Sequence, residues 1–323
     1  MKRLLNTLII LNFSTTLFCS YSFAEPGAEW FPGKSFEELN RAVNSLENLS
    51  QTLVVMDDDD TLTMMNCPKP KDQKTCQYIG GPAWYSWQED LLLNKGSRYR
   101  VATDTQDLLE ISALLLSMNY SKYVEETIPD ILSLLTESGV KLLVLTARGS
   151  SNMSATENQF ENISVTDKKY ENFLDLIKQN ALNGKNSQIA SIAGPFLPKN
   201  KEKGCIESKT NRQVSYQQGV MYVAGQNKGV MLKCLLSRTK STGIKNIVFI
   251  DDTKKNVTDV YAAFEDSKKY TVKAIHYTQL KEHKSALTEG KNSQLYQEKA
   301  QKRWREIKRT LRTELLAPAL PKT

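Results

Sequence analysis

The sequence predicts an α/β fold in which helices cover both faces of a parallel sheet. Along the 323-residue chain, short apolar runs rich in β-branched residues alternate with segments whose apolar residues recur at helical spacing. This alternation is typical of a parallel sheet, because crossovers between parallel strands usually run through helices. Two of the apolar runs end directly in carboxylates, at Asp57 and at Asp251. Ligands of such sheets bind beyond the carboxyl ends of the strands, so a functional site is expected at that edge.

Residues 1–24 predict a secretory signal peptide. Lys2 and Arg3 precede an apolar segment over residues 4–18, and a small-x-small cleavage sequence ends at Ala24. The alternative is an uncleaved membrane anchor, which the short and interrupted apolar segment disfavours. We therefore expect a secreted or periplasmic protein that is cleaved near Ala24 and has no stable membrane insertion after cleavage.

The charge balance suits a small anionic substrate. The formal net charge of the full chain is +7, and it falls to about +5 when residues 1–24 are removed. A mildly basic protein attracts anions, although many proteins without anionic ligands have a similar charge. No nucleic-acid partner is expected, and the sequence points to no particular protein partner.

Four cysteines remain after residue 24, and in an oxidising compartment an even number predicts disulfide bonds. A zinc site is poorly supported, because the chain has only two histidines and no Cys-x-x-Cys pair. Cys67 with Cys76 is the easiest pairing, since it closes a small loop. Cys205 with Cys234 would then follow by elimination, and the sequence alone fixes neither pairing.

The N-terminal half contains two predicted strands and a long insert between them. Ser35 and Glu38 have the spacing of a capping box, which predicts a helix ahead of the strand that ends at Asp57. Asp104 is a candidate cap for a second helix, and Pro129 suits the first turn of a third. The next buried strand is expected over residues 140–145, which follow Gly139.

The C-terminal half continues the alternation. Residues 150–164 are polar and predict a loop, and residues 194–211 predict a lysine-rich surface excursion. The regular elements expected here are helices over residues 167–182, after residue 228 and over 259–264, and strands over 219–224, 244–250 and 270–277.

Polar side chains follow four of the predicted strands. Asp57 and Asp59 follow the first, Thr146 the second, Lys228 lies just after the third, and Asp251 and Asp252 end the fourth. Each motif alone has an ordinary structural explanation, such as a solvated turn, a helix cap or a surface lysine. Because all of them lie at strand ends on one edge of the predicted sheet, together they indicate a single site.

In order and setting, these residues resemble the four motifs of the haloacid-dehalogenase (HAD) superfamily, which has a Rossmann-like sheet. Asp57, Asp59 and Thr61 match its Asp-x-Asp-x-Thr motif, and the Thr, Lys and acidic-pair motifs are matched by Thr146, Lys228 and Asp251-Asp252. The resemblance extends over residues 53–277. Details such as Gly81-Pro82-Ala83-Trp84, Leu145-Thr146-Ala147-Arg148 and Asn227-Lys228-Gly229 look most like a secreted bacterial branch of the superfamily known as a domain of unknown function.

The resemblance implies a Mg2+-dependent phosphatase that hydrolyses a phosphomonoester through an aspartyl-phosphate. It implies that Asp57 attacks phosphorus, that Asp59 is the general acid and base, and that Thr146 and Lys228 bind the phosphoryl group. Mg2+ would be held by Asp57, the backbone carbonyl of Asp59, Asp251 and Asp252. Asp58 has no implied role, and Asp60 stands where the superfamily often has Gly. The alternative is a non-enzymatic, effector-like binding protein with a structural metal at the same carboxylates.

The resemblance also implies an α/β core, residues 25–62 and 141–290, and a mostly helical cap, residues 63–140, that selects the substrate. Within the cap, Trp84, Tyr85 and Trp87 either stack on the substrate or pack the subdomain. Residues 291–323 form a basic helix and tail. This helix either binds an anionic surface or, as we favour, packs an apolar stripe on the protein with its cations in water; the stripe is Leu295, Trp304, Ile307, Leu311 and Leu315.

Overall fold

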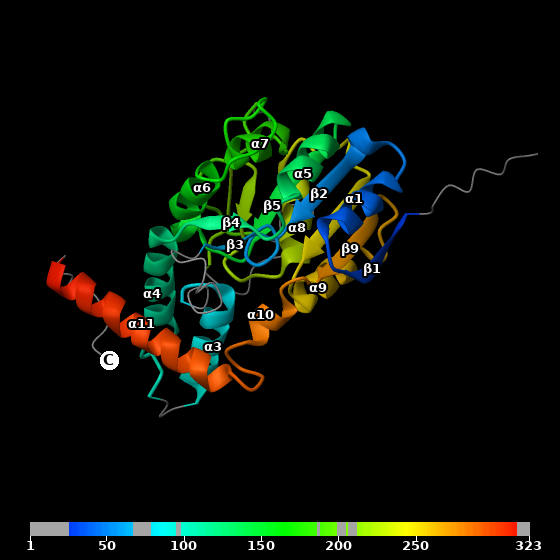
Figure 1. Cartoon of the computed structure of the whole chain (residues 1–323). Coiled ribbons are helices and arrows are strands. Elements are labelled where there is room, and N and C mark those ends of the chain that lie inside the picture. The colour runs from blue at the N-terminus through cyan, green and yellow to red at the C-terminus, as the bar shows by residue number, and fades with distance from the viewer. Residues whose placement is uncertain are drawn as a thin grey trace, which may run out of the picture.

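A seven-stranded sheet forms the centre of the larger part of the molecule (Figure 1). The structure is a computed structural model that describes residues 26–66, 79–94, 98–185, 188–198, 205 and 212–314. The strand order is β1 (Gly27–Gly33), β9 (Thr271–Tyr277), β8 (Asn246–Asp251), β2 (Thr52–Met56), β5 (Lys141–Thr146), β7 (Val220–Tyr222) and β6 (Ser215–Gln217). All neighbouring strands are parallel except β6 and β7, which are antiparallel.

Helices cover both faces of this sheet. On one face, Val54 and Met56 of β2 pack into a core with helices α1 (Phe36–Asn44), α5 (Ile128–Glu137), α6 (Met153–Glu161) and α7 (Phe173–Asn180). On the other face, Leu53 and Val55 pack with α8 (Lys228–Arg238) and α9 (Lys254–Phe264). Successive side chains of a strand point to opposite faces, so β2 contributes to both cores. The predicted α/β class, with a mostly parallel sheet between helical layers, is confirmed.

The edge strands and one helix differ from the expectation. Strands β1 and β6 were not predicted; β1 is only partly buried, and an edge strand needs less apolar sequence than a central one. Residues 150–164 are not a loop, because they contain a 3-10 turn, Ser150–Asn152, and helix α6. Several buried residues of α6 are polar and are satisfied by hydrogen bonds. The apolar periodicity that marks a buried helix is therefore weak in this segment.

Three predicted helix starts have different outcomes. The Asp104 carboxylate caps helix α4 (Thr105–Met118) by accepting a hydrogen bond from the N–H of Asp107 (3.0 Å). Pro129 lies in the first turn of α5, as predicted. The Ser35 side chain makes no capping hydrogen bond at α1, so the predicted capping box is wrong. The Glu125 carboxylate accepts the N–H of Phe36 instead (2.9 Å), which satisfies a donor at this helix start from a distant part of the chain.

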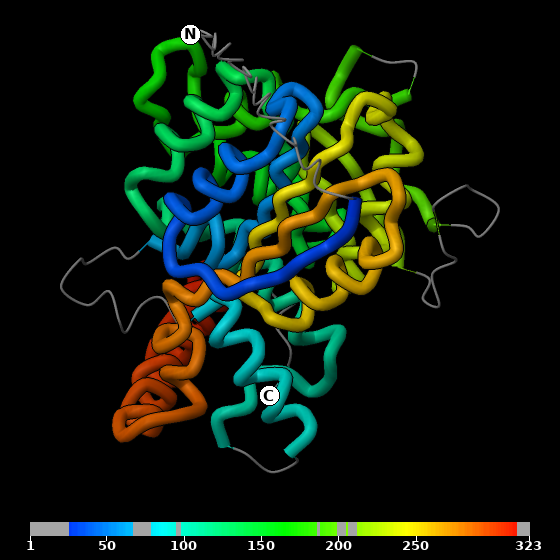
Figure 2. Tube along the Cα trace, turned by 90° about the vertical axis from the view of Figure 1, so that its right-hand side faces the viewer, coloured from blue at the N-terminus to red at the C-terminus, as the bar shows by residue number. Residues whose placement is uncertain are grey.

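A second group of helices lies away from the sheet, at the bottom left of Figure 1 and below the sheet in Figure 2. We call this group the helical lobe; it consists of α3 (Pro82–Leu93), α4, α10 (Lys281–Ser285) and α11 (Ser293–Glu314). The chain enters and leaves it near a two-stranded antiparallel sheet of β3 (Thr63–Met65) and β4 (Ser121–Tyr123). Residues 63–140 therefore contribute to two places, since α5 packs in the main core and α3 and α4 pack in the lobe.

The lobe has its own apolar core, which joins the insert to the C-terminal helix. Trp84 and Trp87 of α3 are buried there with Trp304 and Leu311 of α11. The packing explanation therefore holds for these two insert tryptophans, while Tyr85 is only half-buried. The apolar stripe of α11 packs in the lobe through Trp304, Ile307 and Leu311. Leu295 is an exception because it is exposed, and Leu315 lies outside the described residues.

Cys205 and Cys234 form a disulfide bond. This bond links Cys205 to helix α8, which contains Cys234. Cys67, Cys76 and the predicted signal peptide over residues 1–24 lie outside the described residues. Among the helices that the structure describes, none has the length and apolar character needed to cross a bilayer.

Candidate active site

The acidic run Asp57-Asp58-Asp59-Asp60 forms a tight turn at the carboxyl end of β2. The N–H of Asp57 still donates to the carbonyl of Ile250 in β8 (3.0 Å), so the sheet continues up to this residue. The chain then turns back on itself, because the carbonyl oxygen of Asp58 accepts the N–H groups of three later residues: Thr61, Leu62 and Thr63. Asp60 has a φ of 59°, a left-handed conformation that favours Gly. Asp60 therefore adopts a backbone conformation that a Gly would adopt at lower cost.

Lys228 bridges two carboxylates that come from different strands. Its Nζ lies 2.5 Å from Oδ1 of Asp57 and 2.7 Å from Oδ2 of Asp251, and the residue is 1% exposed. Lys228 is the first residue of α8, which is capped by Asn227 through the N–H of Val230 (2.9 Å). The helix start therefore delivers a buried ammonium group to the ends of β2 and β8.

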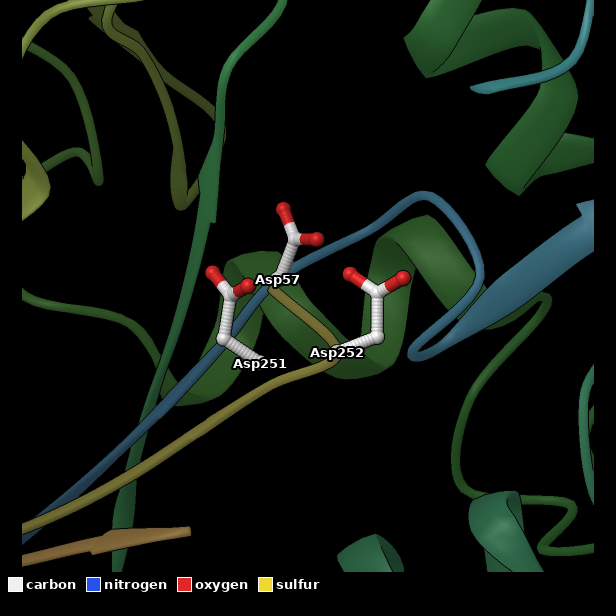
Figure 3. Close-up of side chains that lie close together, drawn as sticks. All are labelled: Asp57, Asp251 and Asp252. Carbon is white, nitrogen blue, oxygen red and sulfur yellow. The ribbon is translucent and has the colours of Figure 1, made fainter. Parts of the chain in front are cut away.

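Asp57, Asp251 and Asp252 form a buried triad of carboxylates. One oxygen from each lies within 4.8 Å of the others, and Figure 3 shows the three side chains close together at the ends of their strands. The carboxylate of Asp251 accepts hydrogen bonds from the N–H of Thr253 (2.8 Å) and from the Asn256 amide (3.1 Å). Asp252 forms an ion pair with Lys284 of α10. The side chain of Asp59 is not part of this triad.

Arg148 holds the side chains of Asp59 and Asp58. It forms two hydrogen bonds with Asp59, from Nη2 to Oδ1 (2.7 Å) and from Nε to Oδ2 (2.9 Å), and its Nη1 lies 2.9 Å from Oδ2 of Asp58. The same Nη1 donates to Thr156 (2.9 Å) and to Gln159 (3.0 Å) of α6. The other Asp58 oxygen accepts the hydroxyl of Thr63 (2.7 Å). Asp58 therefore stabilises the turn.

Thr146 ends β5, the strand beside β2 in the sheet. Its fully buried hydroxyl oxygen accepts the N–H of Arg148 (3.2 Å), so the hydroxyl proton is available for another acceptor. Thr146 pairs with Tyr222, the last residue of β7, and a five-residue loop then leads into α8. The four groups of predicted residues thus lie at the same edge of the sheet.

A family model described as "Protein of unknown function (DUF2608)" matches residues 32–317. The chain belongs to this family. No curated protein matches the sequence. Among solved structures, the chain is similar to the one titled "Crystal structure of cytosolic 5'-nucleotidase IIIB (cN-IIIB) bound to cytidine", at 10% identity and a TM-score of 0.29, over 84% of this chain and 92% of that one.

Burial and mutual repulsion raise the pKa values of the three triad carboxyl groups in the DUF2608 site. Burial raises the pKa of Asp57 to about 7; the charge of Asp251 adds to this shift and Lys228 opposes it. Burial also raises the pKa of Asp252 to about 6, against the opposing charge of Lys284. The pKa of Lys228 stands above its usual value, because the attraction of Asp251 and Asp57 outweighs its burial. The ammonium group is therefore charged at neutral pH.

The donor set of the DUF2608 site suits a divalent cation. Asp57 to Asp60, Asp251 and Asp252 bring six carboxyl groups to this edge, and the cationic side chains among the described residues that pair with them are Arg148, Lys228 and Lys284. The excess of buried negative charge requires protons or a cation. Mg2+ prefers carboxylate and carbonyl oxygens, which is what the triad offers.

Several residues of the DUF2608 site were not singled out by sequence reasoning. Arg148 could have been found, since it follows Thr146 by two positions in a strand-end loop. Asn256 stands in an Asn-x-Thr sequence, and the structure gives its amide a hydrogen-bonding role at Asp251. Lys284 lies in a short helix 31 residues after the strand-end residue Thr253, whose hydroxyl it contacts (3.1 Å), and no local pattern marks it.

Proposed function

We propose that the protein is a Mg2+-dependent phosphatase that hydrolyses a small phosphomonoester through an aspartyl-phosphate on Asp57. The observation that carries this proposal is the position of Asp57. Its buried carboxylate lies against the Lys228 ammonium group and within the triad formed with Asp251 and Asp252. A carboxylate next to a cation and a potential metal site is suited to attack an anionic phosphoryl group, because its surroundings offset the repulsion between the two anions.

In the first step, a lone pair of the Asp57 carboxylate forms a bond to phosphorus while the bond from phosphorus to the leaving oxygen breaks. Asp59 gives its proton to that oxygen, so the leaving group departs as an alcohol. Asp59 suits this role because it follows Asp57 by two residues in the turn and its side chain is 30% exposed, so a substrate can reach it. Thr146 and Lys228 would donate hydrogen bonds to the phosphoryl oxygens.

In the second step, a water oxygen attacks the phosphorus of the aspartyl-phosphate and the bond from phosphorus to Asp57 breaks. Asp59 accepts the proton of that water, which restores both carboxyl groups to their starting states. Each step moves one proton through Asp59. The two hydrogen bonds from Arg148 orient the Asp59 carboxyl group beside Asp57.

Asp57, Asp251 and Asp252 would hold Mg2+ together with the backbone carbonyl of Asp59. When bound, Mg2+ would supply positive charge that offsets the phosphoryl oxygens and the three carboxylates. Asn256 and Thr253 orient the Asp251 carboxylate through three hydrogen bonds, and Lys284 pairs with Asp252. Partners of this kind fix the direction of metal-ligating carboxylates.

We further propose that the helical lobe is the cap that selects the substrate. The C-terminal end of α4 contacts helix α6 of the core. There, Nε2 of Gln159 donates to the carbonyls of Leu116 (2.8 Å) and Asn119 (3.2 Å). Tyr85 is the half-buried aromatic residue of α3, and we propose it as the lobe residue that contacts the substrate. Export through the predicted signal peptide completes the proposal, and the Cys205–Cys234 disulfide supports an oxidising compartment.

The deciding experiment measures phosphate release from a panel of phosphomonoesters with Mg2+. Wild type is expected to turn over at least one of them, and Asp57→Asn to lose activity by a factor of about 10³ or more. Asp266→Asn is the matched control, because this exposed carboxylate lies away from the site. Beryllium fluoride, which mimics the phosphoryl group on an aspartate, is expected to raise the melting temperature of the wild type and not of Asp57→Asn.

The second candidate function is a binding protein in which the triad holds a structural metal. The buried triad alone supports it as well as the enzyme. In that case Mg2+ would raise the melting temperature, but no substrate would turn over and beryllium fluoride would have no effect. Such a result would reject the phosphatase.

A further inference from the structure

A basic depression lies on the helical lobe, away from the carboxylate site. It has a volume of about 570 Å³ and is formed by the C-terminal half of α11 together with the segment between α3 and α4. Among the lining residues that the structure describes, none is acidic and six are cationic: Arg98, Arg100, Arg305, Lys308, Arg309 and Arg312. We call this set the arginine depression.

Much of this positive charge is unbalanced by protein groups. Among the residues that the structure describes, Arg100, Arg305, Arg309 and Arg312 make no side-chain hydrogen bond or ion pair with a carboxylate. The pKa of Lys308 is lowered by burial and by the charge of Arg312, as expected where like charges crowd. Cations that repel one another within a hollow are unfavourable for the protein alone, and an anion bound between them would remove that cost.

The two segments that form the walls are anchored by the lobe core. Trp304 forms part of the lining and is 2% exposed, so it anchors α11 beneath the arginines. On the other wall, Nη2 of Arg98 donates to the hydroxyl of Tyr99 (2.7 Å), and the Tyr99 ring packs against Trp87 with 6.1 Å between centroids. The two walls therefore come from segments about 200 residues apart in the sequence, fixed by one apolar core.

The shape and composition indicate the chemistry of the ligand. Five of the six cations are arginines, whose planar guanidinium groups bind phosphate through paired hydrogen bonds. A single-stranded nucleic acid would require exposed aromatic rings for base stacking, and Trp304 is buried. Insertion into a membrane surface would require an apolar face on α11, and that face is packed in the lobe core. A volume of this size matches a small ligand.

We propose that the arginine depression is a binding site for a soluble small molecule that carries two or more phosphate groups. The site is separate from the carboxylate triad and does not depend on the proposed phosphatase activity. Several arginines in one hollow can each pair with a different phosphate oxygen, so affinity should rise with the number of phosphates. It should fall as salt is added, since the lining is partly exposed.

The test is calorimetric titration of the purified protein with inorganic tripolyphosphate, in metal-free buffer at low ionic strength. The double variant Arg309→Gln/Arg312→Gln is expected to weaken binding by a factor of about ten or more. Lys299→Gln/Lys302→Gln is the matched control, because it removes the same charge from exposed positions of the same helix outside the depression. The control is expected to weaken binding less than about two-fold.

Three results would overturn the proposal. The first is that tripolyphosphate produces no binding heat at low salt. The second is an equal loss of affinity in both double variants, which would show that binding depends on the net charge of the helix and not on the depression. The third is that phosphatidate-containing vesicles or a short oligonucleotide bind through Arg309 and Arg312 while tripolyphosphate does not. Because both double variants leave Asp57 and its neighbours unchanged, a negative result here is distinct from a failure of the phosphatase proposal.

Discussion

Arg148 holds the Asp59 carboxylate by both of its oxygens, at 2.7 Å and 2.9 Å. The two residues are 89 positions apart in the sequence. Through its Nη1, Arg148 also contacts Gln159, whose amide donates to the end of α4 in the helical lobe. The proposed general acid and base is therefore joined to the lobe by a continuous set of hydrogen bonds. Movement of the lobe would be transmitted to the direction of Asp59 through this path.

The first prediction concerns the geometry of this contact. Arg148→Lys keeps the charge but cannot form the paired hydrogen bonds, so Asp59 loses its fixed direction. We expect kcat to fall by a factor of about 10², with little change in KM, because the transfer of the proton is affected more than substrate binding. The measurement is steady-state kinetics together with the pH profile of kcat, whose shape should change if Asp59 is the group affected.

Arg41→Lys is the control for this exchange, because Arg41 is exposed on α1. A merely structural role for Arg148 would lower the melting temperature and leave the kcat of the folded fraction and its pH profile unchanged. That outcome would contradict the positioning role. The free energy of unfolding of Arg148→Ala should be about 3–5 kcal/mol lower than that of the wild type, since this change leaves the buried Asp58 carboxylate without its cation.

The second prediction is that the metal-free protein becomes more stable as the pH is lowered from 8 to 5. The pKa values of Asp57 and Asp58 are about 7 in the folded protein, raised first by burial, whereas an unfolded Asp titrates near ~3.9. The folded state therefore binds more protons than the unfolded state between these values, so its stability is greatest at low pH and declines as pH rises through about 7. The measurement is the melting temperature in metal-free buffer at several pH values.

His283 acts in the opposite direction, and Mg2+ provides the second half of the test. Burial lowers the pKa of His283 to about 4, so protonation of the unfolded chain removes stability as pH falls below ~6.5. The carboxyl groups outnumber it, and the net change should follow them. Added Mg2+ should raise the melting temperature at pH 8 and much less at pH 5.5, because protons and the metal compete for the same oxygens. A melting temperature that declines steadily from pH 8 to pH 5 would show that these carboxyl groups are not protonated in the fold.

The central strands and their ends could be predicted from the sequence, since a strand buried on both faces must be apolar throughout. Strands β2, β5 and β8 are such runs, and each stops where the sequence becomes polar. Parallel strands bring their carboxyl ends to one edge, so the sequence could place Asp57 and Asp251 at the same edge, whereas the pairing of β2 with β8 that makes them neighbours came from the structure. The edge strand β1 was missed because it is only partly buried and needs no uniform apolar run, and β6 was missed because it is three residues long and two of them are polar.

The contacts that complete the site could not be predicted in the same way. The pairing of Arg148 with Asp59 and of Lys284 with Asp252 depends on where two loops and a short helix come to lie in space. Helix α6 carries few apolar residues, and its buried positions Thr156 and Gln159 serve the hydrogen bonds of Arg148. Hydropathy patterns describe burial of apolar surface, whereas these residues are buried as a polar network.

The third prediction is that Asp60→Gly stabilises the metal-free protein at neutral pH by about 1 kcal/mol and leaves activity intact. Asp60 is 1% exposed, its Oδ2 has no hydrogen-bond partner among the residues that the structure describes, and its φ is 59°. Its pKa is raised by burial and by the charges of Asp252 and Asp59. Asp60→Ala separates the two effects, since it removes the charge but keeps the unfavourable φ. Chemical denaturation should therefore rank the Gly variant above the Ala variant; the reverse order, or a loss of activity, would give the Asp60 side chain a role of its own.

The fourth prediction concerns Gly229, which follows Lys228 at the start of α8. A Cβ at this position would lie 2.2 Å from the carbonyl oxygen of Asp259 and 2.7 Å from Cβ of Ala263, both in α9. The backbone carbonyl cannot move aside as a flexible side chain could, so Gly229→Ala must push α8 away from α9. We expect a loss of about 1–3 kcal/mol in unfolding free energy. A lower kcat should accompany it, because the displaced helix carries the Lys228 ammonium away from Asp57.

Ser237→Ala, at an exposed position of the same helix, is the control for the general effect of an alanine. If Gly229→Ala unfolds at the wild-type denaturant concentration and retains wild-type kcat, the close approach of α8 and α9 is not what holds Lys228 in place.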